Sequence, residues 1–136
     1  MLIPKKVKHR KWHKGRNKGR QIETRGLELS YGRFGLKALE SARLNSRQIE
    51  SARRTITNFM KREGRLWIRV FPDKPITKRP PETTMGGGKG SVDHYVYVVR
   101  PGRVIFEMDA PSAEKANQAL RLAGYKLPFK TRVISR

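Results

Sequence analysis

The sequence predicts an α+β domain behind a basic N-terminal arm. Short segments alternate like strands, two longer stretches have the period of a helix, and the first 20 residues carry cations without acids. We expect a small mixed sheet with two helices over residues 22–136, and an extended basic arm over residues 1–21. A chain of 136 residues suits one such domain with a modest hydrophobic core.

The charge of the chain restricts its function. There are 32 Lys+Arg against 11 Asp+Glu, which gives a net charge of +21. Such a cation attracts polyanions, and nucleic acid is the expected partner because phosphate neutralisation releases counterions. No apolar or basic amphipathic run is long enough to indicate a membrane partner, and no secretory signal is visible, so we expect an intracellular partner. The chain has no cysteines, which excludes disulfides and thiolate metal sites.

The first 20 residues form a block of like charge. Such a block cannot pack on itself, so it should be irregular when free. We interpret it as an arm that becomes ordered on RNA, with its tryptophan or arginines stacking on bases; the alternative is a solvated tail. The residues predicted here to bind rRNA are Lys5, Lys6, Lys8, Arg10, Lys11, Trp12, Lys14, Arg16, Lys18 and Arg20.

Residues 22–42 alternate like a strand, with a change of phase at residues 32–35 that predicts a bulge or bend. The clearest helix follows. Asn45 can cap it in a box with Gln48, and we expect it to end at Gly64. Its predicted apolar stripe consists of Ile49, Ala52, Ile56, Phe59 and Met60.

The opposite face of this helix is cationic. We predict that its cations contact rRNA phosphates; the alternative is a solvated face with an ion pair between Glu50 and Arg54. The predicted rRNA-binding residues of this face are Arg47, Arg54, Lys61 and Arg62.

Residues 66–71 alternate like a strand, whereas four prolines in residues 72–81 predict an extended connector without regular structure. Three cations of the connector, Lys74, Lys78 and Arg79, are further candidates for rRNA contact. Residues 94–109 are typical of a hairpin around a Pro101-Gly102 turn.

The C-terminal part of the chain predicts a short helix and a last strand. Ser112 should cap the helix, and Gly124 and Pro128 should close it. Residues 130–134 form the predicted strand. The inner stripe of the helix is Ala116, Ala119, Leu120 and Ala123.

The glycine-rich stretch at residues 85–90 does not match a nucleotide-binding loop. A phosphate-binding loop of the GxxxxGK[ST] type needs glycine where Thr83 stands and Ser or Thr where Gly90 stands. Such a loop also leads into a helix, whereas this stretch leads into a predicted strand. His9 and His13 have helical zinc-ligand spacing, but Arg10 replaces the catalytic Glu of a zinc protease. We expect no active site, cofactor or metal. Close approach of a glycine backbone to nucleic acid is the favoured interpretation; the alternative is a mobile loop tip.

Several segments, in order along the chain, resemble the L-sixteen family of large-subunit ribosomal proteins, bacterial type. The segments are "MLIPKKVKHRKWHKGR", "SYGRFGLKALE", "NSRQIESARRTI", "LWIRVFPDKPITKRP", "MGGGKG", "PGRVIFEMD" and "LAGYKLPFKT". One departure is Thr84, which stands where family members commonly carry arginine. No role of that arginine is carried over to this chain.

The resemblance implies a hammerhead-like β motif and a structural role in the large ribosomal subunit. It implies binding to large-subunit rRNA, contact with A-site and P-site tRNA near the peptidyl transferase centre, and neighbouring ribosomal proteins. The loop that would reach the centre is Met85, Gly86, Gly87, Gly88, Lys89 and Gly90. Bacterial cytoplasm is favoured over the mitochondrial matrix. The alternative function is a free-standing nucleic-acid-binding or RNA-chaperone protein.

Overall fold

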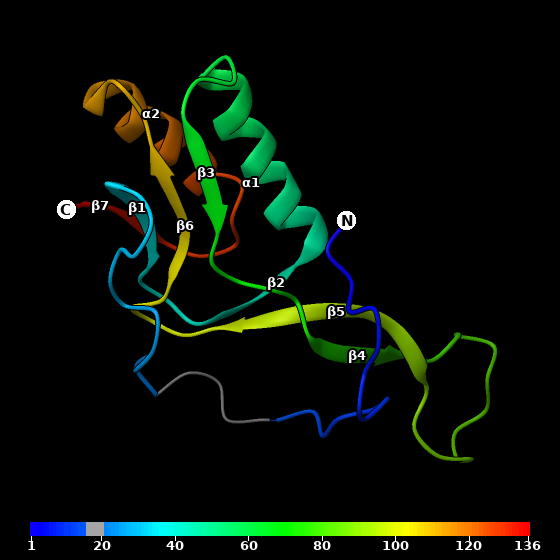
Figure 1. The fold of residues 1–136 in the computed structure, drawn as a ribbon. Coiled ribbons are helices and arrows are strands. Elements are labelled where there is room, and N and C mark those ends of the chain that lie inside the picture. Colours follow the sequence, from blue (N-terminus) through cyan, green and yellow to red (C-terminus); the bar gives the residue numbers. More distant parts are fainter. Residues whose placement is uncertain (16–20) are drawn as a thin grey trace.

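A computed structural model describes residues 1–15 and 21–136 (Figure 1). Within these residues the chain forms seven strands and two helices, so the predicted α+β class is confirmed. The strands form two antiparallel sheets, however, and the expected single mixed sheet is wrong. The three-stranded sheet lies below the four-stranded one in Figure 1; helix α2 lies at the top of the view, and helix α1 runs from the top down to the three-stranded sheet.

The first sheet contains four strands in the order β3-β6-β1-β7. Its strands are β3 (Arg65–Ile68), β6 (Val104–Asp109), β1 (Phe34–Ala38) and β7 (Thr131–Ser135). The first five residues of β6 are all buried, which explains why its sequence is apolar at successive positions, with the buried Glu107 as the exception, instead of alternating. The predicted strands at residues 66–71 and 130–134 are confirmed, the former with a shorter extent.

The second sheet has the order β2-β5-β4. Its strands are β2 (Ala42–Asn45), β5 (Ser91–Val99) and β4 (Lys74–Lys78). The last of these corrects the prediction of an irregular connector at residues 72–81. Pro75 lies within β4 opposite Tyr95, and the strand tolerates it because β4 is at the edge of the sheet, where a missing amide need not break a ladder.

The predicted hairpin at residues 94–109 is wrong, although its turn exists. The amide of Arg103 donates to the carbonyl of Arg100 at 3.2 Å, and Gly102 has a φ of +98°. Strands β5 and β6 then enter different sheets. The reason is that backbone groups of the turn bond elsewhere: the Gly102 amide donates to Ala38 and the Val104 amide donates to Gly26.

Helix α1 (Ser46–Phe59) begins with the predicted capping box. The Gln48 amide donates to the Asn45 side chain at 2.8 Å, and the Asn45 amide donates to the Gln48 side chain at 3.1 Å. The helix ends before the expected Gly64, because Lys61 and Arg62 adopt positive φ and turn the chain away. The predicted stripe is otherwise confirmed: Ile49, Ala52, Ile56 and Met60 are buried, and Phe59 is partly buried.

Helix α2 (Ala113–Gly124) packs against α1 and against β1 and β7. Its four predicted stripe residues are buried, and it ends at Gly124 as expected. Ser112 occupies the N-cap position, but its side chain makes no capping hydrogen bond, which corrects that detail of the prediction. The two helices thus close the apolar side of the first sheet.

Residues 22–33 contain no strand, contrary to the prediction for residues 22–42. The amides of Ser30, Tyr31 and Gly32 instead donate to the buried carboxylate of Glu107, with distances from 2.7 to 3.2 Å. Because these amides are occupied, they are not available for a strand ladder. The pairing of β1 with β6 does contain an irregularity, but it lies between Leu36 and Lys37 and not at residues 32–35.

Candidate nucleic-acid interface

The cationic segment at residues 1–15 runs alongside the second sheet (Figure 1). It has no helix or strand, in agreement with the expected irregular backbone. It is nevertheless held to the domain, because Leu2 packs against the core and the carbonyl of Lys14 accepts hydrogen bonds from two side chains of the sheet. A boundary between an arm and a domain at residue 21 stays a prediction.

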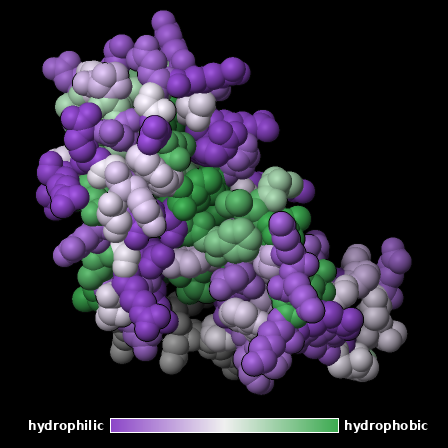
Figure 2. Space-filling model, in the orientation of Figure 1, coloured by the Kyte–Doolittle hydropathy of each residue, from purple (hydrophilic) through white to green (hydrophobic). Residues whose placement is uncertain are grey.

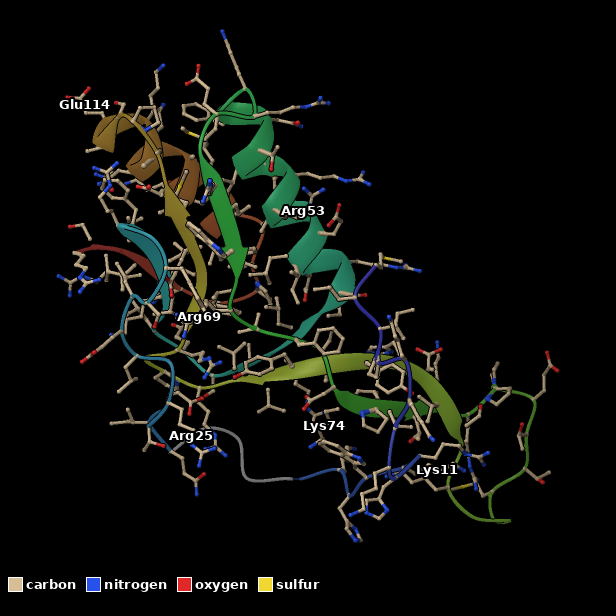
Figure 3. All side chains as sticks on the ribbon, in the orientation of Figure 1. Lys11, Arg25, Arg53, Arg69, Lys74 and Glu114 are labelled. Atoms are coloured by element: carbon tan, nitrogen blue, oxygen red, sulfur yellow. The ribbon has the colours of Figure 1, made fainter. Side chains whose placement is uncertain are left out.

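Two cations converge on the Lys14 carbonyl oxygen. The guanidinium of Arg43, on β2, and the ammonium of Lys74, on β4, each donate to it at 3.0 Å. Figure 3 shows Lys74 directed from β4 toward this segment. Burial, followed by the charges of Arg43 and Lys89, lowers the pKa of Lys74. The site therefore concentrates positive charge around one carbonyl.

Arg43 was not among the predicted contacts. It lies in the sequence "ARLN", where Leu44 is fully buried and Arg43 projects to the opposite face. The alternation of a short strand is a signal for it, but this signal is weak because β2 has only four residues. Strand periodicity alone would not have shown that Arg43 meets Lys74, because β5 separates their strands.

The glycine loop is also joined to the arm. The ammonium of Lys11 donates to the carbonyl of Lys89 at 2.8 Å, and the ammonium of Lys89 donates to the carbonyl of Trp12. The sequence predicted nucleic-acid contacts for both segments but gave no sign that they touch. Their contact creates one continuous surface from residue 11 to the loop.

The loop itself is exposed and has an unusual backbone. Met85 is 97% exposed, and Gly86, Gly87 and Gly88 all have positive φ, at +107°, +70° and +92°. Outside the loop's own neighbouring residues, no atom of residues 1–15 or 21–136 lies within 4 Å of where a Cβ would stand on any of these three glycines. The loop can therefore bring its backbone close to a partner without obstruction from its own domain.

Arg79 fixes the shape of this loop from within. Its guanidinium donates to the carbonyl of Gly86 at 2.6 Å and also to the carbonyl of Gly88. The predicted contact of Arg79 with rRNA stays a prediction. Lys78, which precedes it at the end of β4, is exposed.

The cations predicted for the first helix lie on α1 or just after it, and not in the arm or the glycine loop. Arg47 and Arg54 are exposed on the helix, while Lys61 and Arg62 are exposed just beyond its end. Glu50 binds Arg53 at 2.7 Å and Arg54 at 3.0 Å, so the alternative of a helix ion pair is confirmed for Arg54. These hydrogen bonds, from Arg53 above all, lower the pKa of Glu50 to about 2.

The remaining predicted residues of the arm divide into two groups. Four cations are exposed and contribute to the positive surface, namely Lys5, Lys6, Lys8 and Arg10. Arg16, Lys18 and Arg20 lie outside the described residues. Figure 2 shows hydrophilic side chains over much of the visible face, including the end of the molecule that carries the second sheet.

The described residues contain no cluster of three or more His, Asp or Glu side chains that could hold a metal ion. His94 pairs with the neighbouring Asp93 at 2.7 Å, and this hydrogen bond lowers the pKa of the Asp93 carboxyl. Both side chains are about half exposed. The described helices include none with the length and apolar character needed to cross a membrane.

A comparison with known protein families gives a match over residues 4–134 to the family described as Ribosomal protein L16p/L10e. The match covers nearly the whole chain, and the chain belongs to this family. The resemblance found in its sequence segments is thereby confirmed. Members of the family are structural proteins of the large ribosomal subunit and not enzymes.

Proposed function

From its membership of this family, we propose that the chain binds large-subunit rRNA and presents loop 85–90 to A-site and P-site tRNA beside the peptidyl transferase centre. The observation that carries the proposal is the junction of the cationic segment with the exposed glycine loop through Lys11 and Lys89. A protein anchored in rRNA through the first segment would hold the second at a defined place.

The chemistry of the two segments suits two kinds of contact. Flexible lysine and arginine side chains neutralise phosphates of folded rRNA, and this binding releases counterions. The glycine loop offers unobstructed backbone, which can approach a tRNA backbone more closely than a loop with side chains. Phosphate contacts would therefore position the protein, and the loop would supply the shape that meets tRNA.

We further propose that the ribosome in question is that of the bacterial cytoplasm in preference to the mitochondrial matrix, because residues 1–16 resemble bacterial members. Neighbouring ribosomal proteins are proposed partners as well. A free-standing RNA chaperone remains the competing function, since it would share the net charge of +21.

Sedimentation separates these two functions. A tagged full-length chain is expressed in cells, and ribosomal subunits are resolved on a high-salt gradient. A structural constituent should stay with the large subunit, because many contacts are buried in the particle. A free-standing chaperone should be stripped from it, because exposed phosphate contacts weaken steeply with salt. Recovery of the chain only in the soluble fractions would refute the proposal.

A further inference from the structure

The second sheet carries its cations on the face that lies beneath the arm. Residues directly opposite each other on antiparallel strands share a face, and so do alternate residues of one strand. Arg43 is opposite Val98, and Lys74 is opposite Val96. All four side chains therefore project from the same face of β2, β5 and β4.

The arm completes a cleft on this face. Trp12 of the arm lines it together with Ala42, Arg43, Lys74 and Val98, and its volume is about 570 Å³. Trp12 and Val98 are each 41% exposed, so apolar surface is open to a ligand between the indole ring and the cations that line the cleft, which are Arg43, Lys74 and Arg100. Clefts of this size that combine apolar walls with a few convergent polar groups are typical of ligand sites.

The residues that line the cleft include the cations Arg43 and Lys74. Arg43 and Lys74 both reach the same carbonyl oxygen at 3.0 Å, so their charged groups are close together. Within residues 1–15 and 21–136, neither forms an ion pair with a carboxylate, and the charged neighbours that act on Lys74 are Arg43 and Lys89. A carbonyl is a weaker partner for these cations than a phosphate oxygen would be.

We propose that this cleft binds one unpaired nucleotide of RNA, with its phosphate on Arg43 and Lys74 and its base against Trp12 and Val98. The inference rests on the proposed RNA-binding function and deepens it. An unpaired base can leave its strand and stack on an aromatic ring, whereas the bases of an A-form duplex are already stacked and its deep groove is too narrow to admit side chains. The cleft therefore selects single-stranded or bulged RNA over a continuous duplex.

The test measures binding of the full chain to a short single-stranded RNA and to the duplex that this strand forms with its complement. Trp12→Leu keeps an apolar side chain but removes the aromatic face. It should weaken binding to the single strand about tenfold, as expected for one stacked base, and should leave duplex binding nearly unchanged. Circular dichroism confirms that the variant is folded.

The double variant Arg43→Gln with Lys74→Gln tests the phosphate contact. It should reduce the slope of log K against log salt for the single strand by about one, the value for one neutralised phosphate. Arg132→Gln is the matched control, because Arg132 is an exposed cation on β7 at the edge of the other sheet. It should alter neither the salt slope nor the preference between the two RNAs by a comparable amount.

If Trp12→Leu loses affinity equally for the single strand and the duplex, or for neither, the proposal of a nucleotide site in this cleft is wrong. The chain could still remain with large subunits in high salt, and in that case only this inference fails. A wild-type chain that binds neither RNA and does not sediment with the large subunit would refute both this inference and the proposed function.

Discussion

The ammonium group of Lys11 donates a hydrogen bond to the carbonyl oxygen of Lys89 at 2.8 Å, although 78 positions separate the two residues in the chain. Lys89 returns a hydrogen bond to the carbonyl of Trp12. Each lysine thus holds the backbone of the other's segment. The link makes the position of the glycine loop depend on the position of the cationic arm.

The first prediction tests this link. Replacing Lys11 and Lys89 by alanine should release the arm near Trp12, because both reciprocal hydrogen bonds are lost. Chymotrypsin, which cleaves after aromatic residues, should then cut at Trp12 faster than in the wild type at low salt. Lys8→Ala is a suitable control, since Lys8 is an exposed cation of the same arm. Equal cleavage rates in all three proteins would show that the link does not restrain the arm.

The second prediction concerns the buried carboxylate that organises residues 30–32. Glu107 is fully buried, pairs with Arg69, and accepts three backbone amides. Glu107→Gln leaves the cation without its counter-charge, so we expect a loss of about 3–5 kcal/mol in the free energy of unfolding. Asp109→Asn is the control because Asp109 pairs with Arg33 at the surface, and it should cost less than about 1 kcal/mol. Urea denaturation measures both.

The Glu107 carboxylate also shows which part of the fold could not be predicted from the sequence. The capping box of α1 and both helical stripes were predictable, because a helix is specified by neighbours within one or two turns. The conformation of residues 22–33 was not predictable, because it depends on hydrogen bonds to Glu107, which follows Gly32 by 75 positions. The sequence "VIFEMD" shows an acid among apolar residues but does not show which amides it binds.

The candidate site was predictable only in its composition. Net charge and the cation-rich arm indicated nucleic acid, and glycines indicated an open loop. The contact between Lys11 and Lys89 joins two irregular segments that are 78 positions apart, and the meeting of Arg43 with Lys74 depends on the order of the strands in the second sheet. The predicted hairpin failed for the same reason: its turn was local, but the partners of β5 and β6 were not.

The third prediction separates the two faces of α1. Ile56 is 1% exposed, so Ile56→Asp buries an unpaired charge and should unfold the domain. The triple replacement of Arg47, Arg54 and Lys61 by glutamine should keep the fold and weaken rRNA binding, most strongly at low salt. Thermal melting and filter binding give the two readouts. A triple variant that unfolds while Ile56→Asp stays folded would reverse the assignment of the faces.

The fourth prediction concerns acid stability. The pKa of Glu50 is lowered from 4.5 to about 2 by its hydrogen bonds with Arg53 and Arg54. A lowered carboxyl pKa stabilises the fold above pH 4.5, and this contribution is lost as the pH falls toward 2. Glu50→Gln should therefore melt at a lower temperature than the wild type at pH 6, with the difference shrinking toward pH 2. A difference that is constant with pH would exclude this ionisation as its cause.

The last prediction concerns the loop. Alanine methyl groups at positions 86, 87 and 88 would meet no atom in the described part of the chain, but each residue has positive φ, which costs an alanine about 1–2 kcal/mol. Because the loop has few core contacts, it should change shape without unfolding the domain, and the melting temperature should stay close to that of the wild type. Ribosomes with the triple alanine loop should bind A-site tRNA more weakly or accumulate late assembly intermediates.

Lys89→Ala separates charge from shape at the same loop. It removes an ammonium group and its hydrogen bond to the Trp12 carbonyl but leaves the three glycines, so the electrostatic part of its effect on tRNA binding should diminish as salt rises. The defect of the triple alanine loop should persist in salt, because it arises from the backbone. Binding of A-site tRNA to purified ribosomes over a salt series distinguishes the two. Normal yield and wild-type accommodation rates for the triple alanine ribosomes would show that the glycine loop is only an exposed tip.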